Sequence, residues 1–155
     1  MARHLPVVGQ KGAPVGDEPP DDRPPWHWVG IGAVFQLLAW LLLSLLAQPL
    51  AAALSRALAS AGDVRAASIV VAATHVFVTL GLGSASSGAL VGRFGGTAGP
   101  REAALSGLLA AGIACGLTAP QAGIIALTVL LPLGALAAAA SWIGAKLGAR
   151  RRPAR

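Results

Sequence analysis

Residues 28–53 read WVGIGAVFQLLAWLLLSLLAQPLAAA and contain no Asp, Glu, Lys or Arg. A helix needs about 20 mostly apolar residues to cross the hydrocarbon core of a bilayer. The run is longer than that, so it predicts a membrane-spanning helix. It is also too long for the core of a signal peptide, and no small-residue cleavage site leads into a soluble region. We therefore expect it to be a retained span.

Three further apolar stretches follow, at about 66–92, 102–118 and 122–147, with charged residues gathered at their ends. The mean hydropathy of +0.68 and the 12% of charged residues place the chain with membrane proteins rather than soluble ones. The link at 119–121 is so short that the last two stretches must form an antiparallel hairpin. Residues 28–148 are thus predicted to be an all-α, integral membrane four-helix transmembrane bundle.

Local signals refine the ends of these helices. Asp63 is a plausible N-cap, because a carboxylate there can accept the free N–H groups of the first turn. Pro100 is well placed at a helix start. Pro132 should free the carbonyl of Thr128 and kink the last helix. The segment at 54–65 either lies on the membrane surface or extends the first span.

The two tails differ in composition. Residues 1–27 are rich in proline and carboxylates and have little to bury, so we expect a disordered cytoplasmic tail. Residues 149–155 are basic. Of the 12 Lys and Arg residues, all but Arg56 and Arg65 lie in the tails, at the end of the last stretch or between the second and third stretches. Since Lys and Arg favour the cytoplasmic side, both termini are predicted to be cytoplasmic.

The basic C-terminus explains the net charge of +6 without nucleic acid, because no stacking aromatics accompany it. Basic residues just after a span attract anionic lipid headgroups instead. The residues expected to do so are Lys146, Arg150, Arg151 and Arg152.

Polar side chains inside the spans form a weak belt if the helices pair as antiparallel neighbours. Ser44 and His75 then reach one depth, and the remaining members of the belt are Thr74, Cys115 and Thr128. Intramembrane ionisable residues are functional candidates because their burial is costly. His75 has two readings: a neutral hydrogen-bonding link between helices, which we favour, or part of a proton relay or ligand path.

Gln36 lies deeper in the first span and should face protein, either as a link between helices or as a substrate contact. Gly88, Gly92 and Gly96 recur at four-residue spacing. Small residues on one face let helix backbones approach closely where no hydrophobic effect operates. We favour helix packing for this face, and the alternative is a Gly- and Ser-lined path through the second span.

Catalytic chemistry has little support. One His and one Cys in the spans fall short of the three or four ligands that zinc needs. No nucleophile–base pair and no paired carboxylates are evident. The single Cys115 allows no intrachain disulfide. We therefore expect no catalytic, metal or cofactor site and no enzymatic activity.

The overall plan resembles small four-span bacterial inner-membrane proteins of uncharacterised function, which are rich in Ala, Gly and Leu, with a glycine-rich hairpin and a basic C-terminus. Two other four-span families fail residue checks. Small multidrug transporters use a carboxylate in the first span, which is missing here. The segment 88–94, GALVGRF, is similar to a fluoride-channel motif, but the chain contains no Asn.

These observations favour a structural, accessory or assembly component that works through helix packing, as a homo-oligomer or with a membrane-protein partner. The alternative is an oligomeric small-solute transporter or channel lined by the second span, with Gln36 and His75 on the path. The absence of an intramembrane carboxylate disfavours cation coupling.

Overall fold

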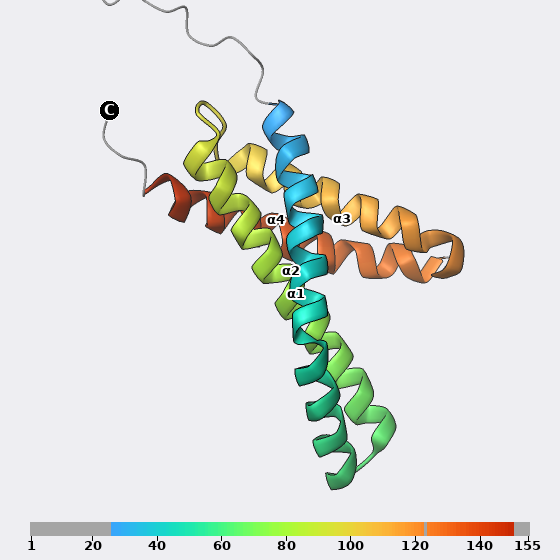
Figure 1. The fold of residues 1–155 in the computed structure, drawn as a ribbon. Helices are drawn as coiled ribbons and strands as arrows, with labels where there is room; N and C mark the ends of the chain where they lie inside the picture. Colours follow the sequence, from blue (N-terminus) through green and yellow to red (C-terminus); the bar gives the residue numbers. More distant parts are fainter. Residues whose placement is uncertain (1–25, 123, 151–155) are drawn as a thin grey trace, which may run out of the picture.

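The computed structural model describes residues 26–122 and 124–150, and these residues form four helices (Figure 1). The described part of the chain is all-helical, which confirms the predicted fold class. The helices are α1 (Trp26–Ala61), α2 (Val64–Phe94), α3 (Pro100–Ala122) and α4 (Ile124–Ala149).

Three of the described segments are long and apolar enough to cross a membrane: Trp26–Ser60, Val64–Phe94 and Leu131–Ala149. The shorter and less apolar α3 is not among them. The sequence predicted four spans. Three helices of the described residues meet the requirement for length and hydropathy, and α3 stays a predicted span. Disorder was predicted for residues 1–27, but Trp26 and His27 form the start of α1, because the helix begins two residues before the apolar run; the rest of that prediction concerns residues 1–25, which lie outside the described residues.

Helix ends follow local chemistry. The segment at 54–61 continues α1, because its Ala, Leu and Arg residues favour helix and it contains no Gly or Pro. The Asp63 carboxylate accepts a 2.8 Å hydrogen bond from the backbone N–H of Arg65, which confirms the predicted N-cap. Pro100 opens α3 as predicted, and the Glu102 carboxylate accepts a 2.7 Å bond from the N–H of Gly99.

The connection between α3 and α4 lies later than the sequence indicated. The chain remains helical through Pro120 to Ala122, and α4 begins at Ile124. Proline is tolerated inside membrane helices because neighbouring groups can satisfy the freed backbone. The predicted antiparallel hairpin does form, since α3 and α4 pack side by side (Figure 1).

The helices are arranged as two crossed hairpins. The α1/α2 hairpin runs along the long direction of the molecule, and the α3/α4 hairpin crosses its upper half steeply (Figure 1). We call the region where they meet the crossing. Its buried residues lie in 29–36 of α1, 79–92 of α2, 103–111 of α3 and 134–148 of α4.

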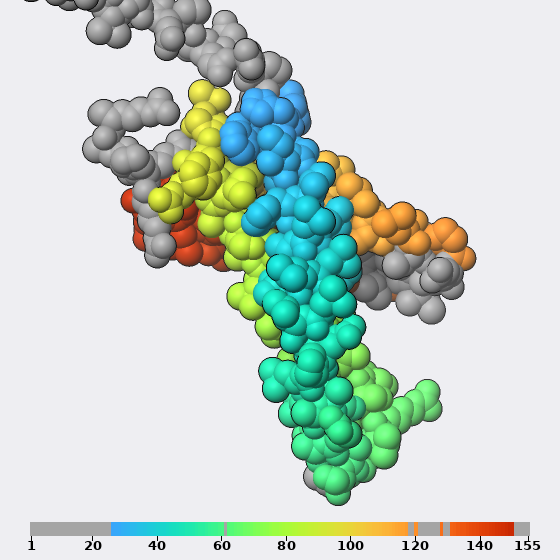
Figure 2. All heavy atoms as spheres, in the orientation of Figure 1, coloured from blue at the N-terminus to red at the C-terminus, as the bar shows by residue number. Residues whose placement is uncertain are grey.

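Two arms project from the crossing. One contains the second half of α1 and the first half of α2, and the space-filling view shows it extending alone (Figure 2). The other is the closed end of the α3/α4 hairpin (Figure 1). Large apolar side chains are exposed on both arms: Leu46 is 70% exposed and Leu117 is 74% exposed. These surfaces are suited to lipid or to another membrane protein.

Candidate functional site

Among the described glycines, the closest approaches to a neighbouring helix join α2 to α4 at the crossing. A Cβ atom built on Gly88 would lie 2.7 Å from the Cα of Ser141, and one built on Gly92 would lie 2.7 Å from the Cα of Ala145. Carbon atoms in contact normally stay about 3.5–4.0 Å apart. Glycine is therefore needed at both positions for the two backbones to meet as they do.

The contact is reciprocal, because α4 supplies glycines that face α2. A Cβ atom built on Gly144 would lie 3.0 Å from the Cα of Ala85, and one built on Gly148 would lie 3.0 Å from the Cα of Ala89. Each helix thus presents small residues at four-residue spacing to the other. Such interlocking faces maximise dispersion contact between helices in lipid.

The other two helices meet the crossing in the same way. A Cβ atom on Gly107 of α3 would lie 2.9 Å from the carbonyl carbon of Ala137 in α4. A Cβ atom on Gly32 of α1 would lie 2.9 Å from the Cβ of Ser106 in α3. All four helices therefore approach through small residues.

Gly96 differs from its expected role in helix packing. It lies beyond the end of α2, where it adopts a left-handed conformation with φ of 58°, and no atom lies within 4 Å of a Cβ built on it. Glycine suits this position because other residues avoid positive φ. The four-residue spacing continues past the end of α2, so Gly96 does not share the helix face of Gly88 and Gly92.

Polar side chains are buried inside the crossing. Five of them are 0% exposed: Gln36, Ser84, Ser87, Ser106 and Ser141. The Ser87 hydroxyl of α2 donates a 2.7 Å hydrogen bond to the carbonyl of Gly32 in α1. The Ser141 hydroxyl of α4 lies 3.1 Å from the carbonyl of Ser84 and 3.4 Å from Gln36 Oε1, and can donate to either. Gln36 therefore faces protein, and hydroxyls tie three helices together.

Most of these serines were missed from the sequence. Ser141 carried one signal that could have found it, since it lies in a four-residue series with Ala137 and Ala145. A serine in such a series can supply both a small side chain and a hydroxyl at a helix contact. Nothing in the sequence indicated that Ser141 would meet Gln36.

The predicted pairing of Ser44 with His75 takes a different form. The Ser44 hydroxyl donates to the Thr79 hydroxyl at 3.3 Å, and Thr79 Oγ1 donates to the backbone carbonyl of His75 at 2.7 Å. The His75 side chain is half-buried. Thr79 lies one helical turn after His75, so it shares the face of α2 that meets α1.

The proposed polar belt is divided between the two arms. Ser44 and His75 lie on α1 and α2, whereas Cys115 and Thr128 lie on α3 and α4. Beyond Gly112, α3 leaves the crossing, and a Cβ built on Gly112 meets nothing within 4 Å. The prediction of a belt assumed that all four helix axes run side by side. The two hairpins instead cross steeply, so their polar residues do not reach one layer (Figure 1).

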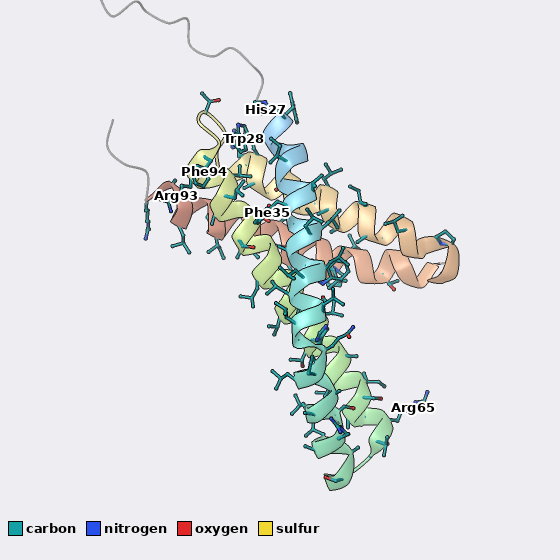
Figure 3. All side chains as sticks on the ribbon, in the orientation of Figure 1. His27, Trp28, Phe35, Arg65, Arg93 and Phe94 are labelled. Atoms are coloured by element: carbon teal, nitrogen blue, oxygen red, sulfur yellow. The ribbon has the colours of Figure 1, made fainter. Side chains whose placement is uncertain are left out.

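Aromatic and basic residues gather at the end of the molecule where α1 begins. The residues at this end include His27, Trp28, Arg93 and Phe94. Arg65 lies at the far tip of the α1/α2 arm (Figure 3). Trp28 packs against the buried cluster formed by Val91, Ala98, Ala103 and Ala145. Indole rings prefer the membrane–water interface, so this end is suited to that boundary.

The expected lipid contacts lie partly in the described chain. Lys146 Nζ lies 3.6 Å from the centre of the Trp142 ring, and Arg150 is exposed. A cation above an indole face is a cation–π contact, and it holds Lys146 beside the aromatic ring. Arg151 and Arg152 lie outside the described residues.

The described residues contain no group of three or more His, Cys, Asp and Glu that could hold a metal ion. Comparison with protein-family models, curated proteins and solved structures finds no match. The crossing is therefore the strongest candidate site, and its chemistry is close packing combined with buried hydrogen bonds.

Proposed function

We propose that the chain is a structural or assembly component of a bacterial inner membrane, which holds its two hairpins at a fixed crossing and presents apolar arms to other membrane helices. The reciprocal glycine contacts between α2 and α4 carry this proposal. They join the hairpins through backbone atoms, which cannot avoid the contact by changing a side-chain rotamer. A rigid centre with exposed apolar arms is suited to organising neighbours.

The exposed leucines of the α1/α2 arm support the second half of the proposal. Leu46 and Leu50 lie one helical turn apart on α1 and are 70% and 72% exposed. Their face offers branched apolar side chains for contact with a second copy or with a partner. Lipid alone would also cover them, so an experiment must distinguish the two.

The transporter alternative is less well supported, because the small-residue face of α2 is already occupied. Ser84, Ser87 and Gly88 are buried against α1 and α4 of the same chain. A path along this face would require the hairpins to separate. The half-buried His75 is the observation that still favours transport.

We further propose that both termini are cytoplasmic. If the membrane normal bisects the angle between the two hairpins, the tight turns that close them lie on one side of the membrane. The start of α1, the α2–α3 loop and the end of α4 lie on the other (Figure 1). Arg93 and Lys146 then share the cytoplasmic side and Arg65 lies outside, as the distribution of basic residues in membrane proteins favours. Both hairpins are then tilted; the lengths of α1 and α2 exceed what a span needs, and the 23 residues of α3 lie within the range for one.

Cross-linking in native membranes tests the assembly role. Single cysteines replace Leu46 or Leu50 in a Cys115→Ala background, and oxidation traps neighbours for identification by gel and mass spectrometry. We expect a disulfide-linked homodimer or a defined adduct. Val78→Cys, at a 52% exposed position of α2 on the same arm, reports non-specific collisions.

A flux assay in vesicles accompanies the cross-linking. Solute flux with the purified chain, together with no cross-link above the control at either leucine, would contradict the assembly role and favour transport. If instead His75→Gln abolished a measured flux without lowering thermal stability, His75 would belong to a transport path.

A further inference from the structure

We propose that the crossing binds one buried water molecule, held by the Gln36 amide, the Ser84 hydroxyl and the Trp40 indole. Within the described part of the chain, three buried side-chain atoms have no hydrogen-bond partner: Gln36 Nε2, Trp40 Nε1 and Ser84 Oγ. Buried polar atoms in folded proteins are nearly always paired, with protein or with ordered water. Three such atoms in one region point to a shared ligand.

Two of the three residues, Gln36 and Ser84, lie around one hydroxyl. Ser141 Oγ is 3.4 Å from Gln36 Oε1 and 3.1 Å from the carbonyl oxygen of Ser84. Trp40 follows Gln36 by one turn on the same face of α1. The backbone nitrogen of Trp40 lies 3.1 Å from the Cβ position of Gly83, the neighbour of Ser84. The unpaired atoms therefore belong to residues at the contact between α1 and α2, and Gln36 and Ser84 also meet Ser141 of α4 there.

The unmet hydrogen-bonding capacity persists in either orientation of the amide. As placed, Gln36 Oε1 faces Ser141 and Nε2 has no partner. If the amide oxygen and nitrogen are exchanged, Nε2 can donate to Ser141 Oγ, which itself donates to the carbonyl of Ser84. The amide oxygen then lacks a donor. One atom of Gln36 needs a further partner in both cases.

Water fits this site better than an anion. The indole and the amide nitrogen supply donors, while the Ser84 hydroxyl can donate or accept. A buried water typically makes about three hydrogen bonds, which matches the number of unpaired atoms. The nearest basic residues along α2 and α4, Arg93 and Lys146, are exposed. An anion would lose its hydration without a buried cation to offset the loss.

This inference rests on the packing role proposed for the crossing and deepens it. Close approach through glycine brings polar groups into a region that lipid and bulk water do not reach. A bound water would satisfy them without adding side-chain volume. Its test observes water at Trp40, whereas the assembly role is tested by cross-links on the arm, so either can fail alone.

Nuclear magnetic resonance of the full-length, ¹⁵N-labelled protein in lipid nanodiscs tests the proposal. Trp40→Phe assigns the indole resonance. We expect a dipolar cross-peak between the Trp40 indole proton and water, with the sign of a long-lived contact in rotating-frame spectra. Trp26, which is 66% exposed, serves as the control for chemical exchange, whose cross-peak has the opposite sign.

Gln36→Met separates bound water from indirect transfer, because it removes the amide while keeping the side-chain size and leaves the Ser84 and Ser141 hydroxyls in place. We expect the cross-peak to be lost in Gln36→Met, whereas magnetisation relayed through a hydroxyl proton would persist. Absence of the cross-peak in wild type, or an unchanged cross-peak in Gln36→Met, would refute the water site. A saturable shift of the indole resonance with chloride would also refute it by identifying an anion.

Discussion

Gly88→Ala is the most direct test of the crossing. The added methyl carbon would lie 2.6 Å from the carbonyl carbon and 2.7 Å from the Cα of Ser141. Normal contact needs about 3.5 Å or more, so α2 and α4 must separate by roughly 1 Å at this point. The opposing atoms belong to the backbone and cannot move by changing a rotamer. The separation would therefore spread to the neighbouring contact between Gly92 and Ala145.

Overpacking of this kind typically costs about 1–3 kcal/mol. For a chain of this size, each kcal/mol lowers Tm by roughly 2–4 °C. We therefore expect Gly88→Ala to lower Tm by about 2–12 °C in a fixed detergent, read by tryptophan fluorescence during heating. Gly88→Ile should be more destabilising, because its branched side chain meets the same backbone.

Gly81→Ala is the matched control. Gly81 lies in the same helix, and a Cβ built on it meets nothing within 4 Å. Alanine there should raise stability by up to about 1 kcal/mol, because it is the better helix former. A Tm for Gly88→Ala equal to or above that of Gly81→Ala would refute the close packing of α2 on α4.

Three other predictions address topology and the polar contacts. Cysteines placed at Ala2 or Ala154, in a Cys115→Ala background, should not react with an impermeant maleimide added to intact spheroplasts, and efficient labelling of either would overturn the cytoplasmic assignment. Ser87→Ala removes the hydrogen bond to α1 and should lower stability by only about 0.6 kcal/mol, the average for such bonds in membranes, as measured by thermal unfolding. His75→Gln should leave both Tm and the arm cross-links unchanged. A lower Tm or a loss of the cross-links would show that glutamine cannot replace the imidazole.

The individual helices could be predicted because hydropathy and capping act locally. The apolar run after Trp28 predicts a helix whatever its neighbours are, and Asp63 and Pro100 act within a single turn. The extension of α1 through 54–61 remained open, since helix propensity and the surface alternative gave opposite answers. Gly96 was misplaced because spacing alone does not show where a helix ends.

The crossing itself could not be predicted. α1 carries apolar residues around its whole circumference, so no face indicates which neighbour it meets. The estimate of depth assumed parallel axes, and for that reason it paired Ser44 with His75 instead of Thr79. Gln36 was correctly expected to face protein, but its contact with Ser141 spans 105 residues of sequence. Such a contact depends on the angle between the hairpins, which the pattern of one helix does not encode.

The crossing also constrains how the chain can be made. Each hairpin closes through a short connection, so each can enter the bilayer as it leaves the ribosome. The contacts that join the hairpins have to wait: Ser141 meets Ser84, which precedes it by 57 residues, only after most of α4 has been synthesised. Until then the glycine face of α2 is uncovered in the membrane. We expect quality-control proteases to recognise a nascent or truncated chain while this face is uncovered. Insertion of α4 covers the face and ends that exposure.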